Sequence, residues 1–240
     1  MLLADLSWEE IQEYLAHEDR LIFSLGATEQ HGRHLGLGCD YLLAEAIANE
    51  TGARTGIAVA PPLAYGMSLH HIKFPGTLSL RPVTLIAVLE DLLRSMYRHG
   101  FRRIMIVNGH GGNTASIASA LQVVTNELEG LRVKECTWWT EPVILKMVDD
   151  YAGPQKGTHS SPVETAFMLG VRPQGVKMER IAHRDAPVTP SHEFMSASQF
   201  AAQYPDGVMG LDPTPGTAEL GRQLLAKSVE ICVAEVQNWD

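Results

Sequence analysis

The 240-residue chain has few cysteines, no surplus of positive charge and no long apolar run. Its three cysteines, Cys39, Cys136 and Cys232, form no Cys-X-X-Cys pair, which argues against a disulfide framework and against a zinc knuckle. The net charge of -9 argues against nucleic acid as the main partner, because phosphate binding requires a basic surface. No run of about eighteen apolar residues is present, and the N-terminus does not resemble a signal peptide. We therefore expect a cytoplasmic protein with no membrane partner.

The composition is that of an ordinary globular protein. Hydrophobic residues make up 45% of the chain and charged residues 20%. A chain of this length can bury one large core, and no internal repeat, low-complexity segment or linker divides it. We therefore expect a single domain over residues 1–240.

Short apolar runs alternate along the chain with segments of helical periodicity, and Ser7 with Glu10 forms a capping-box pattern before the first of these segments. We expect the first helix at residues 8–15, and the two prolines at 61 and 62 should end the second strand. The remaining helices are expected at residues 42–52, 83–98, 117–128, 163–169 and 217–237, and the strands at 21–25, 57–60, 104–107 and 131–136. Residues 187–215 are rich in proline and glycine and should be irregular. The alternation predicts a layered α/β fold with a mostly parallel sheet.

Two glycine-rich loops that follow predicted strands contain histidines and carboxylates. The first contains Glu29, His31 and Asp40, and the second, NGHGGN, contains His110. Ligands of a parallel sheet bind beyond the carboxyl ends of its strands, so both loops should reach the same edge. Glu29 and His31 alternate along the chain and should therefore share one side of an extended segment.

Imidazole and carboxylate groups together form a hard-to-borderline ligand set. This set suits Zn²⁺, Mn²⁺ or Fe²⁺ better than a soft metal. A carboxylate such as that of Asp40 can bridge two cations, and paired cations activate water between them. The loops therefore indicate a candidate metal site, with ordinary loop histidines as the alternative.

Other interpretations of these segments remain open. A glycine-rich turn between a strand and a helix can bind phosphate, so a nucleotide-dependent enzyme using NGHGGN is one alternative. However, Thr114 stands where the pattern GxGxxG requires glycine, and no Walker lysine is present. Cys39 is interpreted as a small packed residue rather than a nucleophile, and no GxSxG elbow occurs. Trp138 and Trp139 are interpreted as core residues, with a place in the wall of the pocket as the alternative.

Five segments resemble, in order, the motifs of the creatininase family of metalloenzymes, which act as creatinine amidohydrolase-like hydrolases. They are GATEQHGRHLGLGCD at 26–40, FPGT at 74–77, NGHGGN at 108–113, HSSPVET at 159–165 and GVMGLDPTPGTAELG at 207–221. The resemblance covers nearly the whole chain. It implies a three-layer α/β/α sandwich and a hydrolase of non-peptide C–N bonds, such as those of cyclic amides or formamides, that activates water between two metals.

The resemblance also assigns roles to individual residues. His159 would be the catalytic residue that moves a proton at the leaving nitrogen, and Asp40 would bridge the two metals. The implied metal ligands are Glu29, His31, Asp40, His110 and Glu164. Candidate substrate-binding residues are His71, Gly111 and Gly112. His71 has an alternative role in bonding loop carbonyls, and His34 is expected to orient the ligands rather than to bind metal.

Two departures from the family pattern bear on the substrate. True creatinine hydrolases carry a glutamate ligand where Gly112 stands, and many relatives carry a second glutamate where Pro162 stands. We therefore expect a small-molecule amide other than creatinine. The implied cofactors are two divalent metal ions per chain, zinc in the first place and manganese or iron otherwise. The implied assembly is a homo-oligomer, with a hexamer as one form. A non-catalytic metabolite-binding relative is a second alternative.

Overall fold

A computed structural model describes residues 1–153, 158–181, 194–210 and 213–239. Within them, four strands form one parallel sheet in the order β2-β1-β3-β4. The strands are β1 (Arg20–Leu25), β2 (Ala58–Leu63), β3 (Arg103–Asn108) and β4 (Arg132–Cys136). The α-helices are α1 (Trp8–Leu15), α2 (Cys39–Thr55), α3 (Pro82–His99), α4 (Thr114–Glu127), α5 (Pro142–Ala152), α6 (Pro162–Val171), α7 (Ala197–Gln203) and α8 (Ala218–Gln237).

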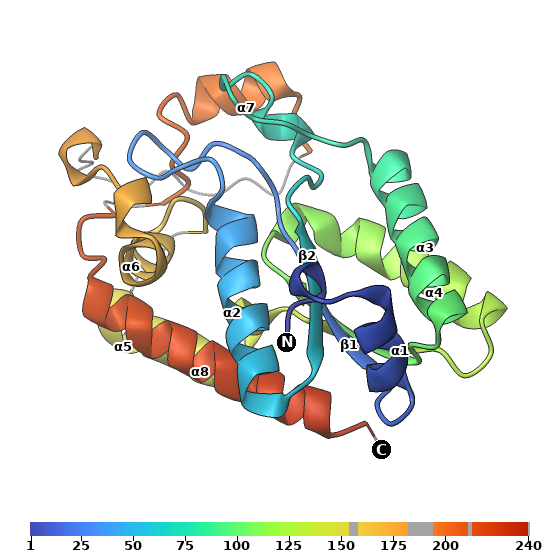
Figure 1. Cartoon of the computed structure of the whole chain (residues 1–240). Helices are drawn as coiled ribbons and strands as arrows, with labels where there is room; N and C mark the ends of the chain where they lie inside the picture. Colours follow the sequence, from blue (N-terminus) through green and yellow to red (C-terminus); the bar gives the residue numbers. More distant parts are fainter. Residues whose placement is uncertain (154–157, 182–193, 211–212, 240) are drawn as a thin grey trace.

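Helices cover both faces of the sheet, which gives the expected three layers (Figure 1). Helices α2, α5, α6 and α8 pack on one face, and α1, α3 and α4 pack on the other. The strand residues divide between these two cores by parity, because successive side chains of a strand point to opposite faces. In β1, Ile22 belongs to the first core and Leu21 and Phe23 belong to the second. Continuous apolar runs are therefore required in the central strands, as the sequence indicated.

Most predicted elements are present, and their ends follow local chemistry. Ser7 and Glu10 form the capping box that begins α1, and Gly100 adopts a left-handed conformation after α3. Helix α2 begins at Cys39 and ends at Thr55, so it is longer at both ends than the periodicity indicated. None of the described helices combines the length and apolarity needed to span a membrane.

Three details of the prediction are wrong. Strand β2 does not end at the two prolines but continues through them to Leu63. It lies at the edge of the sheet, where a proline that lacks an N–H group is tolerated. Helix α5 was not predicted, and α7 lies within the segment expected to be irregular. Both are short helices beside proline- and glycine-rich stretches, and α7 has only seven residues.

Candidate metal centre

The predicted ligands meet beyond the carboxyl ends of β1 and β3. Glu29 and His31 follow β1, His110 follows β3, and Glu164 and His159 come from the start of α6 and the segment before it. Close approach of the β3 loop to α2 depends on Gly109. A Cβ atom at this position would lie 2.2 Å from the backbone oxygen of Asp40.

Asp40 lies in the first turn of α2 and not in the glycine-rich loop, which corrects the prediction from sequence. Gly38 is the N-cap of this helix and supplies no side-chain cap. The N–H groups and dipole at a helix N-terminus favour a carboxylate. This position also holds Asp40 on a rigid element rather than on a loop.

The carboxylate of Asp40 lies between two imidazoles. Its Oδ1 is 2.9 Å from Nε2 of His31, and its Oδ2 is 3.1 Å from Nδ1 of His110. On the other side of His110, Nε2 lies 3.4 Å from Oε2 of Glu29. Three groups of potential ligand atoms, each group within 4.8 Å, result among the described residues, and two of them share Asp40: Glu29, Asp40 and His110; His31, Cys39 and Asp40; and Glu29, His31 and His159. The arrangement suits a carboxylate that bridges two cations.

Glu164 reaches the cluster through a capping box. Its Oε2 accepts hydrogen bonds from the backbone N–H and the hydroxyl of Ser161, the N-cap of α6, at 2.8 and 3.1 Å. The other oxygen, Oε1, lies 3.5 Å from Nε2 of His31. One carboxylate oxygen therefore fixes the helix start while the second faces the cluster.

Several buried polar atoms of the cluster have no hydrogen-bond partner among the described residues. They are both carboxylate oxygens of Glu29, Nε2 of His31 and Oδ2 of Asp40. His31 approaches Asp40 closely, but not at the angle of a hydrogen bond. A buried carboxylate without partners is costly, and such atoms normally bind water, an ion or another polar group. The donor set and its unpartnered atoms therefore fit divalent cations.

Burial and neighbouring charges also shift the pKa values of the residues in the cluster. Burial raises the pKa of Glu29 to about 7, although the neighbouring imidazoles oppose this. Burial also disfavours the charge of Asp40, but His31 and His110 together hold its pKa well below its ordinary value. Burial opposes protonation of His110, yet Glu29 and Asp40 raise its pKa to about 9. These opposed shifts are typical of functional clusters.

Gln30 orients two histidines, and the sequence interpretation missed it. Its amide nitrogen donates to Nδ1 of His71 at 2.8 Å and to the backbone oxygen of Gly207 at 3.0 Å. Its Oε1 accepts from the N–H of Gly32 at 2.9 Å, which fixes the orientation of the amide. The position of Gln30 between Glu29 and His31 was the available signal. However, successive side chains of an extended segment point to opposite sides, so Gln30 was expected to point away from the predicted ligands.

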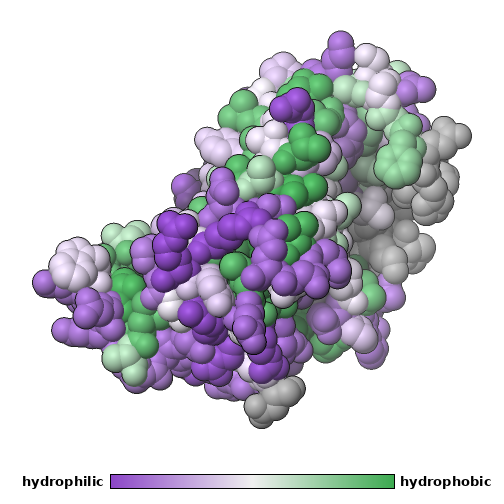
Figure 2. Space-filling view, turned by 90° about the vertical axis from the view of Figure 1, so that its right-hand side faces the viewer, coloured by the Kyte–Doolittle hydropathy of each residue, from purple (hydrophilic) through white to green (hydrophobic). Residues whose placement is uncertain are grey.

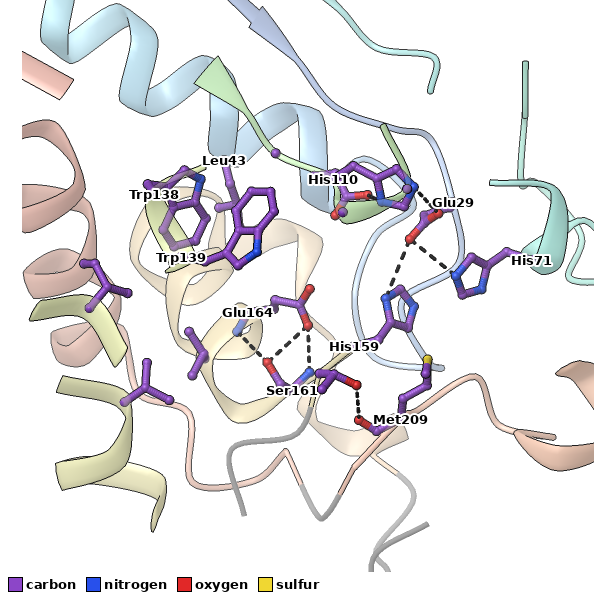
Figure 3. A pocket seen from close by; sticks show the side chains of 18 of the residues that line it. Glu29, Leu43, His71, His110, Trp138, Trp139, His159, Ser161, Glu164 and Met209 are labelled. Atoms are coloured by element: carbon purple, nitrogen blue, oxygen red, sulfur yellow. Dashed lines mark hydrogen bonds and ion pairs between the residues drawn. The ribbon is translucent and has the colours of Figure 1, made fainter. Parts of the chain in front are cut away.

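These contacts define the tautomer of His159. Its Nε2 lies 2.8 Å from the backbone oxygen of Gln30, a group that can only accept, and 3.0 Å from the amide nitrogen of the same residue. Nε2 therefore carries the proton, and Nδ1 is left with a lone pair 3.6 Å from Oε1 of Glu29 (Figure 3). Burial lowers the pKa of His159 to about 4, so the ring is neutral near pH 7. Ser160, the next residue, has a φ of 56°, a strained conformation for a non-glycine residue.

A pocket of about 490 Å³ opens onto the cluster. His71, Gly111 and Gly112 line it, as their predicted role in substrate binding requires. Trp138 and Trp139 line it as well, on the side away from Glu29 and His159 (Figure 3). Both also pack in the core cluster, so the core interpretation and the pocket alternative are each confirmed. The other aliphatic residues that line the pocket are Leu43, Ile144, Leu145, Val148 and Val163.

Gly112 cannot be replaced by a longer side chain without movement of its neighbours. A Cβ atom there would lie 2.4 Å from both Nε2 of His110 and the backbone oxygen of Met67. These two atoms are 3.0 Å apart, a hydrogen bond that holds the imidazole.

His34 does not reach the cluster; its Nε2 lies 2.9 Å from the hydroxyl of Thr165, beside Glu164.

A parallel sheet with helices on both faces, carrying buried carboxylates and imidazoles at its strand ends, defines an α/β protein with a candidate metal centre. The family model described as creatinine amidohydrolase, Creatininase, matches residues 4–236. The chain therefore belongs to the creatininase family, and it is a hydrolase of the class that acts on carbon–nitrogen bonds.

Its relatives include enzymes with different substrates. The mycofactocin precursor peptide peptidase of Mycolicibacterium smegmatis is 32% identical over 226 residues, which cover 91% of this chain and 85% of that protein. The creatinine amidohydrolase of Pseudomonas putida is 27% identical over 254 residues, which cover 99% of this chain and 95% of that protein. Two solved creatininases, a mutant of Zn-Zn type and one described as creatininase Mn, each have a TM-score of 0.86 and 25% identity. Both structures align with 98% of this chain, which covers 96% of the first and 97% of the second.

Proposed function

We propose that the protein hydrolyses the C–N bond of a small non-peptide amide, such as a cyclic amide or a formamide. Two divalent cations, held by Glu29, Asp40 and His110 and by His31, Asp40 and Glu164, would polarise the carbonyl group and activate the attacking water between them. The observation that carries this proposal is the set of buried, unpartnered atoms on Glu29, His31 and Asp40. Zinc is the first choice of metal and manganese or iron the second, because one related structure is of Zn-Zn type and another is a Mn form.

His159 supports proton transfer in this proposal. Its Nδ1 faces the cluster with a free lone pair, while Nε2–H is held by the backbone of Gln30. A neutral imidazole in this tautomer takes a proton from the attacking water at Nδ1 and then returns it to the leaving nitrogen. His159 therefore acts first as a base and then as the acid that the family resemblance implies.

The glycine-rich loop supplies the other contacts to the reacting amide. Gly111 and Gly112 border the pocket beside His110, and a side chain at Gly111 would meet open space. Their backbone N–H groups would donate to the oxyanion that develops as the amide is attacked. His71, whose Nε2 lies 3.6 Å from Oε1 of Glu29, would orient the substrate beside this carboxylate.

A peptide is the second candidate substrate. The peptidase of Mycolicibacterium smegmatis is more similar to this chain than the creatinine amidohydrolase of Pseudomonas putida is, at 32% against 27% identity. The apolar wall at Trp138 and Trp139 would also accommodate an amino-acid side chain. In either case the glycine at 112 argues against creatinine, since a glutamate ligand does not fit there.

The first experiment is a measurement of metal content by mass spectrometry on protein purified without chelator. We expect about two transition-metal ions per chain in the wild type and a loss of metal in Asp40→Ala, because both sites share this carboxylate. Asp91→Ala, an exposed aspartate on α3, is the matched control. Protein with two ions is then assayed against cyclic amides, formamides and short peptides.

The alternatives predict other outcomes. Absence of metal in the wild type, even after addition of zinc or manganese, would contradict the proposal and favour the metabolite-binding relative. Nucleotide binding that persists in chelator would favour the nucleotide-dependent enzyme that uses NGHGGN.

The single domain over residues 1–240, the cytoplasmic location and the homo-oligomer remain predictions. A family match over residues 4–236 supports the first. Exposed apolar side chains support the oligomer, and Figure 2 shows apolar groups emerging on the face that carries α3. The exposed large apolar side chains between residues 65 and 83 are Tyr65, Leu69, Ile72, Leu78 and Val83. Light scattering after gel filtration measures the number of chains, with a hexamer as one expected form.

A further inference from the structure

Cys39 occupies a different environment from the other two cysteines. It is the first residue of α2, directly before Asp40, and its side chain is fully buried. Its Sγ lies within 4.8 Å of ligand atoms on both His31 and Asp40. By contrast, Cys136 and Cys232 contact each other in the core, with their sulfur atoms 2.9 Å apart.

His31 and Asp40, the two potential ligands beside this sulfur, each have an atom without a hydrogen-bond partner among the described residues. Nε2 of His31, in a side chain with no exposed surface, has none among the described residues, and the same is true of Oδ2 of Asp40. Oδ1 of Asp40 and Oε1 of Glu164 lie 2.9 and 3.5 Å from that Nε2, so two carboxylate oxygens lie close to this imidazole nitrogen. In tetrahedral zinc sites, bond lengths of about 2.0–2.3 Å separate neighbouring ligand atoms by roughly 3.3–3.8 Å. The distances from Nε2 of His31 to the carboxylates of Asp40 and Glu164, 2.9 and 3.5 Å, are close to this spacing. The sulfur lies within 4.8 Å of ligand atoms on His31 and Asp40, which places it beside the same candidate cation site.

Packing alone is the competing explanation, because Cys39 belongs to the apolar cluster between α2 and the sheet. Packing accounts for the burial of a small side chain. It does not account for a sulfur atom placed beside potential ligand atoms of both His31 and Asp40.

We propose that Cys39 is a thiolate ligand of the cation held by His31, Asp40 and Glu164. This inference rests on the proposed function, since it concerns one of the two cations of that site. As the metal–sulfur bond forms, the thiol proton leaves to solvent, and no oxidation or reduction occurs. Sulfur ligation makes this site selective for Zn²⁺ or Co²⁺ over Mn²⁺, which prefers oxygen ligands.

The two cation sites then differ in their protein ligands. The site of Cys39 has four ligand side chains. The site of Glu29, Asp40 and His110 has three, because Gly112 contributes none. Catalytic metal sites keep an open position for water or substrate, whereas sites with four protein ligands are closed. Substrate therefore binds at the Glu29 site, beside Gly111 and Gly112.

Cobalt substitution tests this ligand directly. Metal-free protein is reconstituted with Co²⁺, and its near-ultraviolet spectrum is recorded together with the bound cobalt per chain. We expect a thiolate-to-cobalt charge-transfer band in the wild type and in Cys232→Ser, and no band in Cys39→Ser. Cys39→Ser should also bind Zn²⁺ at least tenfold more weakly, on the order of the smallest effect of losing a metal-orienting group, with little change for Mn²⁺.

X-ray absorption at the zinc edge of the wild type does not depend on whether a variant folds. A sulfur scatterer at about 2.3 Å supports the proposal. Two bound ions with no charge-transfer band and no sulfur scatterer would overturn it and leave the hydrolase proposal intact. A wild type that binds no zinc or cobalt would overturn both.

Discussion

Glu29 should make the metal-free protein less stable at alkaline pH than a variant without this carboxylate. The residue has no exposed surface, and burial raises its pKa from the ordinary 4.5 to about 7. A carboxyl with a raised pKa binds its proton more tightly in the folded state than in the unfolded state. Its contribution to stability is therefore complete below about pH 4.5 and is lost as the pH rises through 7.

The size of the effect follows from the two pKa values. The difference between 4.5 and about 7 means that about 3 kcal/mol of unfolding free energy, present at pH 4.5, is lost above pH 7. Glu29→Gln should remove this contribution. In chelator, we expect the difference in stability between variant and wild type to shift in favour of the variant by about 3 kcal/mol between pH 4.5 and pH 8. His110, whose pKa Glu29 helps to raise to about 9, adds a shift of the same sign.

Urea unfolding at several pH values measures this difference, with Glu13→Gln on exposed α1 as the matched control. Zinc should make the wild type more stable than Glu29→Gln at alkaline pH. A cation that binds only the folded state stabilises it by about 2.7 kcal/mol when its concentration is a hundred times its dissociation constant. The variant, which lacks the ligand, should gain less. Parallel stability curves for the variant and the wild type in chelator would refute this account of the buried carboxylate.

Two further substitutions test the catalytic and glycine positions. His159→Ala should keep the bound metal but lower turnover by about 10²- to 10⁴-fold, the usual contribution of a general acid–base group, while His99→Ala on the exposed end of α3 should retain full activity. Loss of metal from His159→Ala would instead make His159 a ligand. Gly112→Ala should lower the unfolding free energy by about 1–3 kcal/mol, because its Cβ would lie 2.4 Å from His110 Nε2 and from Met67. Gly111→Ala, whose Cβ meets open space, should change it by less than about 0.5 kcal/mol, and equal effects of the two variants in urea unfolding would contradict the packing argument.

Local sequence patterns were sufficient to predict the layered fold, and they drew attention to the loops that contain the candidate ligands Glu29, His31 and His110. Strand and helix periodicities are short-range properties, and the side chains of β1 divide between the two cores by parity. The capping box at Ser7 was likewise readable from four consecutive residues. His31 and His110 follow strands that pair in parallel, so topology alone brings their loops to one edge of the sheet.

Other features depend on contacts between residues distant in sequence, and only the tertiary structure decided them. The proline pair at 61 and 62 lies within β2 because that strand is at the sheet edge, which local sequence does not specify. The tautomer of His159 follows from Gln30, which lies 129 positions before it in the chain. The proximity of Cys39 to His31 likewise requires α2 to begin one residue before Asp40. Residue types therefore determined which chemistry is available, whereas long-range packing determined which atoms face one another.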